Sequence, residues 1–291
     1  VRNLFELAVC KRLMSERPVG CLLSGGLDSS IVTALVVKFM AQAQQEAHQE
    51  AHQEAKQSIV DTYAIGLEGS VDLKWARRVS EYLGTRHHEV CLTEQQFLDA
   101  IDATIYQIES YDTTTVRASV GNYLVSKYIY DNTDNVVIFC GDMSDEIFGS
   151  YRGFTKAPSD HEFARENGRM VRDVRCFDLL RSDKSISGAG LEARVPFADK
   201  TFLEFVMSLP PWMKRFGDGA EHAVEKHLLR TAFEGLLPED VMWRRKEAFS
   251  DGISREPWFA AAAAKGEGLR RDYEVNPPPT AEAAWYRALF E

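Results

Sequence analysis

A glycine-rich segment between an apolar run and a helical pattern most constrains how this chain can fold. Residues 19–23 are mainly apolar, which is typical of a buried strand, and residues 31–40 continue as an apolar helix. Gly25 and Gly26 lie between them. Glycines let backbone N–H groups approach a ligand closely, and the N-terminus of the following helix attracts anions. The segment therefore predicts a strand, a turn and a helix that bind an anion.

The acidic residue in this segment indicates which anion. Ser24, Ser29 and Ser30 offer hydroxyl donors, but Asp28 would repel a phosphate group unless a divalent cation lay between them. No lysine follows the glycines, so the segment is not a G-x-x-x-x-G-K P-loop. We expect a metal-chelated polyphosphate here. The alternative is an ordinary glycine turn followed by a serine helix cap.

Composition limits the class of protein that surrounds this segment. A chain of 291 residues can form one large core, or a core with a smaller lobe. Its net charge of −10 argues against nucleic acid or an anionic membrane as the main partner. The five cysteines have neither C-x-x-C nor disulfide-framework spacing. No stretch approaches about 18 consecutive apolar residues, and no signal-peptide pattern is present, so we predict a cytosolic protein.

Strand patterns alternate with helical patterns over the first half of the chain. Beyond residues 19–23, strands are predicted at 59–67, 88–92 and 135–140, and helices at 72–83, 94–109 and 119–130. Residues 111–117 are predicted to be a polar loop. This alternation indicates an α/β fold with a doubly wound parallel sheet, whose ligands bind beyond the carboxyl ends of the strands.

The second half of the chain has a different pattern. We predict the α/β core for residues 1–150 and a mostly helical lobe, without further strands, for residues 151–291. Within the core, residues 41–57 repeat Gln-Glu-Ala-His and are predicted to be a low-complexity insert. The sequence leaves open whether that insert is a surface helix or is disordered.

Carboxylates gather directly after the strand predicted at 135–140. Asp145 is a candidate to share Mg²⁺ with Asp28, because both follow strand ends that face the same edge of the sheet. Asp142 is a candidate base near a reacting nitrogen. The alternative for this cluster is a solvated acidic helix start, which the helix dipole would stabilise.

Two further groups of residues suit a carboxylate ligand and a leaving pyrophosphate. Thr114, Thr115 and Arg117 combine hydroxyls with a guanidinium, which can bind a carboxylate bidentately. Lys246 or Arg245 would neutralise negative charge that develops on a leaving pyrophosphate. The alternatives are a helix-capping loop for the first group and an ordinary surface charge for Lys246.

The motifs in order resemble a known family. Residues 24–30 resemble the SGG-x-DS loop of ATP pyrophosphatases, of the adenine nucleotide alpha-hydrolase type. Together with residues 111–119, 141–146, 190–197 and 246–252, they resemble the synthetase domain of class II, glutamine-type asparagine synthetases. The resemblance covers nearly the whole chain apart from the insert at 41–57.

That resemblance implies a two-step amide synthesis that uses ATP and Mg²⁺. Aspartate would be converted to β-aspartyl-AMP with release of pyrophosphate, and ammonia would then give asparagine and AMP. The family's glutaminase domain is expected to be absent from this chain, so ammonia would be free or come from a partner. A β-lactam-forming synthetase and an ATP-binding pseudoenzyme are the alternatives. The oligomeric state stays open, a homodimer included.

The resemblance also implies a role for individual residues. ATP and pyrophosphate would contact Leu23, Ser24, Gly25, Gly26, Asp28, Ser29, Ile65, Cys140 and Gly141. Aspartate and its adenylate would contact Thr114, Thr115, Arg117, Asp178 and Arg181. Catalytic roles would fall to Asp142, Lys246 and Arg117, and Mg²⁺ would bind Asp28 and Asp145.

The chain departs from the family pattern at one informative place. The family has Ser-Gly-Glu-Gly-Ser-Asp-Glu where this chain has Cys-Gly-Asp-Met-Ser-Asp-Glu at 140–146. Asp142 is therefore one methylene shorter than the family's glutamate, and Met143 replaces a glycine. Because a misplacement of about 1 Å can cost about 10²-fold in rate, we expect amide formation to suffer more than adenylation.

Restoring the longer side chain tests this interpretation. We expect Asp142→Glu to raise the ratio of asparagine to pyrophosphate formed from ATP, aspartate and ammonia, because the carboxylate then reaches the attacking nitrogen. Both products are quantified in the same reaction mixture. An unchanged ratio would contradict the proposed effect of the shorter side chain.

Overall fold

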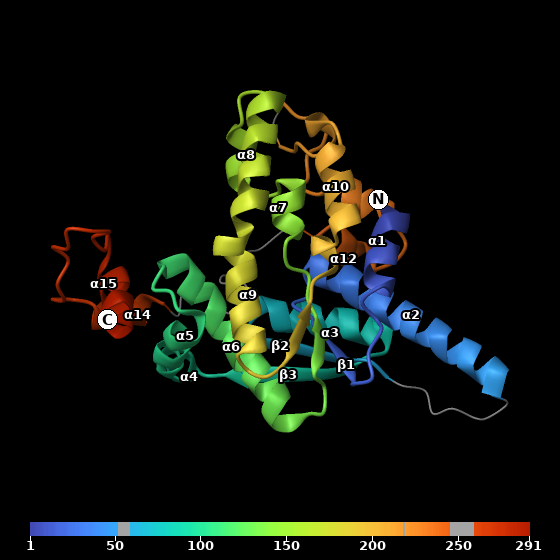
Figure 1. Cartoon of the computed structure of the whole chain (residues 1–291), viewed down its shortest axis with the longest axis horizontal. Coiled ribbons are helices and arrows are strands. Elements are labelled where there is room, and N and C mark those ends of the chain that lie inside the picture. Colours follow the sequence, from blue (N-terminus) through green and yellow to red (C-terminus); the bar gives the residue numbers. More distant parts are fainter. Residues whose placement is uncertain (52–58, 218, 245–258) are drawn as a thin grey trace.

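A parallel sheet of five strands, in the order β3-β2-β1-β4-β5, lies at the centre of the fold (Figure 1). The computed structural model describes residues 1–51, 59–217, 219–244 and 259–291. The strands are β1 (Val19–Leu22), β2 (Asp61–Leu67), β3 (Arg86–Leu92), β4 (Val137–Phe139) and β5 (Glu192–Arg194). In β1, Cys21 lies between Thr62 of β2 and Phe139 of β4. The predicted parallel α/β class is confirmed.

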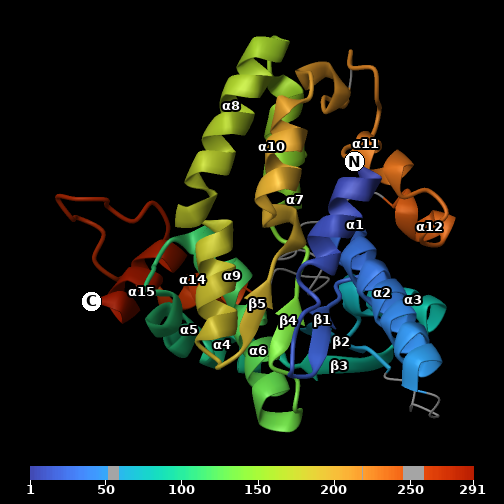
Figure 2. The ribbon, with the colours of Figure 1, turned by 45° about the vertical axis from the view of Figure 1, so that its right-hand side comes forward.

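Helices cover both faces of this sheet (Figures 1 and 2). In the first half of the chain they are α1 (Arg2–Cys10), α2 (Leu27–Ala51), α3 (Val71–Leu83), α4 (Glu94–Asp99), α5 (Ile101–Ile108) and α6 (Thr113–Asn132). After β4 come α7 (Ser144–Phe148), α8 (Asp160–Asp173), α9 (Asp178–Ser187), α10 (Lys200–Ser208), α11 (His227–Ala232), α12 (Glu239–Met242), α14 (Ala260–Lys265) and α15 (Ala281–Phe290). Four short 3₁₀ helices span Arg152–Lys156, Val174–Cys176, Pro196–Ala198 and Pro211–Met213.

Alternate residues of the central strands enter two separate cores. Val137 and Phe139 of β4 pack with α1, α2 and the second-half helices α10 to α12. Ile138, between them, packs with α5, α6 and α9 on the other face, together with Tyr63 and Ile65 of β2. Because successive strand side chains point to opposite faces, a sheet covered on both faces needs apolar residues at nearly every position. This explains the continuous apolar runs in the sequence.

The second half of the chain adds a strand that was not predicted. β5 pairs in parallel with β4, with Ala193 opposite Ile138, although we expected no strand beyond residue 150. The strand is only three residues long and carries Glu192 and Arg194 at its ends. It therefore lacks the apolar run by which the other strands could be recognised. The prediction of a strand-free second half is wrong.

The predicted polar loop at 111–117 is mostly helical. α6 begins at Thr113, so three consecutive threonines, which are poor helix formers, lie in its first turn. Asp112 caps this turn by accepting a hydrogen bond from the Thr115 N–H at 2.8 Å. The cap offsets the low helix propensity of the threonines, and the prediction of a loop for these residues is wrong.

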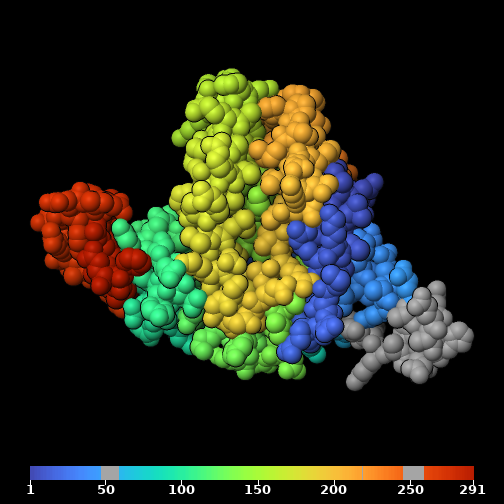
Figure 3. Space-filling model, viewed as in Figure 1, coloured from blue at the N-terminus to red at the C-terminus, as the bar shows by residue number. Residues whose placement is uncertain are grey.

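Two peripheral parts of the chain lie away from the sheet edge that matters for binding. α2 continues to Ala51, so residues 41–51 of the predicted insert are helical, and residues 52–57 lie outside the described residues. The C-terminal residues project from one side of the molecule (Figure 3), where α15 contacts α5 and α6. None of the described helices combines the length and apolar character that crossing a bilayer requires.

An ionic cluster around the buried carboxylate of Asp61 joins three strands at their amino ends. Asp61 of β2 lies 2.6 Å from Nη2 of Arg86 and 2.9 Å from Nε2 of His88, both on β3. Nδ2 of Asn135, just before β4, donates to Asp61 at 2.8 Å. Burial would raise the pKa of Asp61, but Arg86, Asn135 and His88 outweigh it and lower the pKa to about 2. The cluster holds the strands opposite the carboxyl edge, where ligands bind.

Neutralising Asp61 should show how much this cluster contributes to the free energy of unfolding. The pKa of Asp61 is lower in the folded chain than its ordinary value of 3.8, so its stabilisation is present above about pH 4 and is lost as the pH falls towards 2. We expect Asp61→Asn to lower the free energy of unfolding at pH 7 by about 2 kcal/mol and to flatten this acid dependence. Urea unfolding at several pH values measures both. Asp102→Asn, at an exposed position of α5, is the control, and equal acid dependence in all three proteins would contradict the prediction.

Candidate active site

A cavity of about 520 Å³ lies at the carboxyl edge of the sheet. Its walls come from the ends of β1, β2 and β4, from α6, α7 and α9, and from the segment that precedes α11. β1 lies between β2 and β4, so the connections from the first strand and from the fourth leave in opposite directions at this place. Such a switch point is where doubly wound sheets bind ligands. The volume of the cavity is typical of small-molecule sites.

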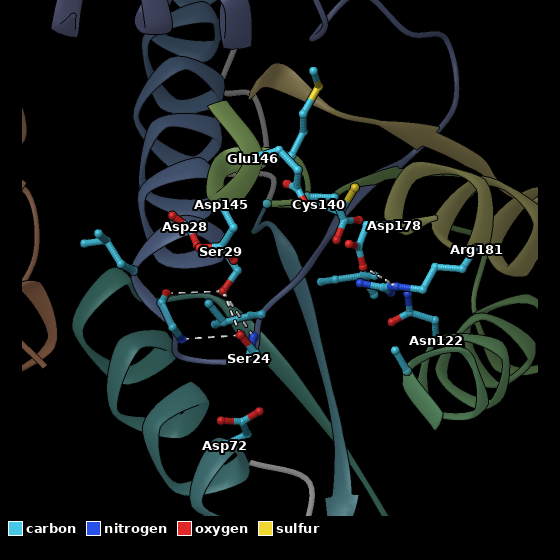
Figure 4. A pocket seen from close by; sticks show the side chains of 18 of the residues that line it. Ser24, Asp28, Ser29, Asp72, Asn122, Cys140, Asp145, Glu146, Asp178 and Arg181 are labelled. Atoms are coloured by element: carbon cyan, nitrogen blue, oxygen red, sulfur yellow. Dashed lines mark hydrogen bonds and ion pairs between the residues drawn. The ribbon is translucent and has the colours of Figure 1, made fainter. Parts of the chain in front are cut away.

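The turn between β1 and α2 is held by its own serines (Figure 4). The hydroxyl oxygens of Ser24 and Ser29 lie 3.1 Å apart, and the Gly26 N–H donates to Ser24 at 3.3 Å. Gly25 has φ +72°, and a Cβ there would lie 2.4 Å from the backbone nitrogen of Ala76 in α3. Only glycine fits this position. Ser24, Gly26 and Ser29 line the cavity, whereas Gly25 supports the turn from behind.

The end of β4 packs directly against the start of α2. A Cβ on Gly141 would lie 2.6 Å from the Ser29 backbone nitrogen, so the segment after β4 approaches the start of α2 as closely as glycine allows. Cys140 is buried, and burial together with nearby Asp142 raises the pKa of its thiol well above the usual range. Leu23 and Ile65 add apolar wall on the neighbouring strands. This part of the cavity suits a flat, largely apolar group such as a nucleobase.

A buried lysine lies between the two aspartates predicted to share a metal ion. Nζ of Lys226 is 2.5 Å from Oδ2 of Asp28 and 2.6 Å from Oδ1 of Asp145. Ser144 also donates to Asp28, at 2.7 Å. Burial would lower the pKa of Lys226, but the charges of Asp145 and Asp28 outweigh it and raise the pKa above its ordinary value. The structure thus brings Asp28 and Asp145 to one point, and a single ammonium group lies between them.

The donor set at this point is compatible with Mg²⁺. Two carboxylates converge on a single cation there, and Mg²⁺ is usually held by one or two carboxylates together with substrate phosphates. Within the described ranges, no cluster of three or more His, Cys, Asp or Glu side chains forms a metal site by itself. Asp28 and Asp145 would therefore hold the ion jointly with a polyphosphate. Whether they do so stays a prediction.

The other end of the cavity carries a second set of charges (Figure 4). Arg181 donates to Asp178 at 2.8 Å, and Ser182 donates to Asp142 at 2.6 Å. Burial would lower the pKa of Arg181, but Asp178 and Asp142 keep it above its ordinary value. The structure thus places Asp142, Asp178 and Arg181 at one end of the cavity, and their roles towards a substrate stay predictions. Carboxylates beside a guanidinium suit a ligand with both an ammonium and a carboxylate group.

Glu146 joins the two ends of the cavity. It is buried, and Tyr151 donates a hydrogen bond to it at 2.5 Å while lying 3.4 Å from Asp178. Burial raises the pKa of Glu146 to about 7; Tyr151 opposes that rise, and Asp178 and Asp145 add to it. The carboxyl group is thus less acidic than an exposed glutamate.

The threonine and arginine cluster on α6 is divided. Thr114 lines the cavity, whereas the Thr115 hydroxyl donates to Asp112 at 2.8 Å on the capping side of the helix. Arg117 binds both oxygens of Glu282 in α15, one of them at 2.7 Å, and its guanidinium lies 3.6 Å from the centre of the Phe259 ring. Neither Thr115 nor Arg117 lines the cavity. Their contact with substrate stays a prediction.

Several functional candidates were missed by sequence reasoning. Lys246 was predicted to meet the phosphates but lies outside the described residues. The cation that the structure places beside Asp28 is Lys226, in the turn directly before α11, where neither a glycine motif nor a strand end marks it. Asp72, Tyr151 and Arg244 also line the cavity without a local motif. Only Glu146 had a signal, as the third carboxylate of its cluster.

Comparison with known proteins is consistent with this site. The family model described as asparagine synthase matches residues 1–169 and 155–269. The glutamine-hydrolyzing asparagine synthetase of Gallus gallus is 43% identical to the chain over 304 residues, and those of Homo sapiens and Mus musculus are each 44% identical over 304 residues. These alignments cover 100% of the chain and 52% of each relative. The chain therefore spans about half the length of the curated relatives it matches.

Removing the Lys226 ammonium should expose the repulsion between the two aspartates. We expect Lys226→Met to lower the free energy of unfolding by about 3 kcal/mol, because it leaves two charges without their partner. Millimolar MgCl₂ should raise the free energy of unfolding of Lys226→Met more than that of the wild type, since the ion can replace the ammonium between Asp28 and Asp145. Thermal unfolding with and without MgCl₂ measures both effects.

Lys38→Met is the matched control for this prediction. Lys38 is exposed and pairs with Glu6 at the surface, at 2.9 Å, so its loss should change stability little and should not alter the response to MgCl₂. An equal gain from MgCl₂ in the wild type and in Lys226→Met would contradict a shared cation position.

Proposed function

The chain belongs to the asparagine synthase family, and from this premise we propose that it converts aspartate to asparagine at the expense of ATP. The observation that carries the proposal is the meeting of Asp28, Asp145 and Lys226 beside the turn of Ser24 and Ser29, in one cavity with an apolar wall. This arrangement supports a bound polyphosphate next to a nucleobase. The family's curated relatives are named as asparagine synthetases, which supports the same substrate class.

The proposed reaction has two steps. The side-chain carboxylate of aspartate attacks the α-phosphorus of ATP, the bond to the β-phosphate breaks, and pyrophosphate leaves. Ammonia then attacks the acyl carbon of β-aspartyl-AMP, loses a proton, and displaces AMP. Asp142 is the proposed acceptor of that proton, since it lies in the cavity and is oriented by Ser182.

The two ends of the cavity would bind the two substrates. Leu23, Ile65, Cys140 and Gly141 would border adenosine, and the turn with Ser24, Gly25, Gly26 and Ser29 would hold the phosphates. Mg²⁺, held by Asp28 and Asp145, would supply positive charge that stabilises the leaving pyrophosphate. Thr114, Asp178 and Arg181 would receive aspartate at the other end.

Arg117 and Thr115 would take part only after a local change. In this structure the carboxylate of Glu282 occupies the face of the Arg117 guanidinium that a substrate carboxylate would use. Aspartate would therefore have to displace Glu282 before Arg117 could bind it bidentately. Lys246 keeps its proposed role at the phosphates from the resemblance of residues 246–252 to the family motif.

We propose glutamine as the ultimate source of the ammonia. The curated relatives are named as glutamine-hydrolyzing, and the chain matches only 52% of their length, so a glutaminase domain outside this sequence would supply ammonia to Asp142. A cytosolic location and a homodimer stay proposals. All five cysteines are unpaired, which suits a reducing compartment.

Product analysis tests the proposed function. The chain is incubated with ATP, Mg²⁺, aspartate and ammonium, and we expect pyrophosphate and asparagine in equal amounts. Asp28→Asn should lower pyrophosphate release by about 10²-fold or more while thermal unfolding shows an intact fold, since it removes a carboxylate from the phosphate site. Asp183→Asn, at an exposed position of α9, is the matched control.

The products distinguish the alternative interpretations. Absence of both products would contradict the ligase proposal and favour an ATP-binding module without catalysis. Pyrophosphate without asparagine would place the failure at the amide-forming step, where Asp142 and Met143 depart from the family pattern. Substantial turnover by Asp28→Asn would show that Asp28 is not a required ligand of the metal-bound phosphates.

A further inference from the structure

A lysine outside the cavity is buried, and no carboxylate among the described residues pairs with it. Lys214 directly follows the 3₁₀ helix Pro211–Met213, and it is 6% exposed. Its Nζ lies 2.6 Å from Oδ1 of Asn167 in α8 and 3.3 Å from the carbonyl oxygen of Ile147 in α7. Within the described ranges, it makes no ion pair. Its contacts are neutral acceptors.

Such a group is costly to bury. Removing an ammonium from water without an opposite charge disfavours its charged form, and burial alone lowers the pKa of Lys214 to about 8. Methionine, which is similar in length, would fill the same space without this cost. Packing therefore does not explain why this residue is a lysine. The groups that Lys214 binds offer the explanation.

Lys214 and its partner Asn167 both contact the carboxyl end of α7. Lys214 donates to the Ile147 carbonyl, and Nδ2 of Asn167 donates to the Glu146 carbonyl. Gly149 ends the helix with φ +58°, and a Cβ there would lie 2.6 Å from the Phe163 ring of α8. The Gly149 N–H donates to the Glu146 carbonyl at 3.3 Å, and the Asn167 and Lys214 side chains add donors to carbonyls that a helix of five residues does not satisfy internally.

The amino end of the same helix builds the phosphate side of the cavity. Ser144 donates to Asp28 at 2.7 Å, and Asp145 lies 2.6 Å from the Lys226 ammonium. At a rise of 1.5 Å per residue, α7 is only about 7 Å long. Because so short a helix moves as one piece, a shift of its carboxyl end displaces Ser144 and Asp145. α7 contacts α8 and α10, and all three helices lie beyond the edge of the sheet (Figures 1 and 2).

We propose that Lys214, together with Asn167, is a positioning residue that holds α7 so that Ser144 and Asp145 meet Asp28 and Lys226. The inference rests on the proposed function for its catalytic consequence, and on the contacts at both ends of α7 for its geometry. Lys214 itself does not line the cavity, so it acts on the reaction only through α7.

Substitution of Lys214 tests the proposal by separating kcat from KM. We expect Lys214→Met to lower kcat for pyrophosphate release at least tenfold, because a displacement of about 1 Å in reacting groups costs up to about 10²-fold. KM for ATP should stay within about threefold, since the nucleotide wall is untouched. Lys200→Met, at an exposed position of α10, should behave as the wild type. Wild-type kcat in a folded Lys214→Met would overturn the proposal.

The pH dependence supplies a readout that a purely structural lysine would not give. Because the pKa of Lys214 is lower in the folded chain than its ordinary value of 10.5, stability from this group rises as the pH increases from about 8 towards 10.5. No charged side chain among the described residues contributes to that pKa. Loss of the proton turns the charge-assisted hydrogen bonds of Lys214 to Ile147 and Asn167 into weaker neutral ones. We therefore expect wild-type kcat to fall above about pH 8 without a matching fall in Tm. Lys214→Met should lack this alkaline fall.

The remaining outcomes also decide the question. If Lys214→Met does not fold, the wild-type profile stands alone: a constant kcat from pH 7 to 9 overturns the proposal, and a fall without a matching change in Tm supports it. If the wild type releases no pyrophosphate, the proposed function fails separately. The crystal structure of Lys214→Met then decides the geometric part: the distance from Lys226 Nζ to Asp145, 2.6 Å here, should exceed about 4 Å, and an unchanged distance overturns it.

Discussion

The ammonium of Lys226 between Asp28 and Asp145 is the interaction on which the rest of this structure depends. It joins the start of α2, the short helix α7 and the segment before α11, which lie far apart in the sequence. Burying these charges without partners would be costly, so their pairing favours the meeting of the three elements. The same contact thus attaches the second half of the chain to the sheet edge and gathers the charges of the candidate phosphate site. Stability and binding share one set of atoms.

Charged side chains lie at the two ends of the cavity, and an apolar wall lies between them. Asp28, Asp145 and Lys226 lie at one end, and Asp178 with Arg181 lies at the other. At the amino ends of the strands, Asp61 holds β2, β3 and the start of β4 in place, so the carboxyl edge has a rigid base. A reaction between a nucleotide and an amino acid needs this arrangement, because both must be oriented before they can react.

Much of the fold could be predicted because its signals are local. The apolar strand runs, the turn at Gly25 and Gly26, and the carboxylates after β4 each lie within a few neighbouring residues. A parallel sheet brings its strand ends to one edge, so the meeting of Asp28 and Asp145 followed from topology alone. β5 escaped prediction because three residues carry no periodic pattern. The start of α6 was not predicted because one side-chain cap outweighs the low helix propensity of three threonines.

The sequence by itself determined the fold class, the glycine turn and which carboxylates face the same edge of the sheet, because these follow from local pattern and strand order. Only the tertiary structure decided which cation lies between the carboxylates, and that Arg117 is bound by Glu282 at a distance of 165 residues along the chain. Lysine and arginine side chains are long, and most of them are solvated, so their sequence position does not show where they bind. Burial and pairing with a distant carboxylate select the few that build a site.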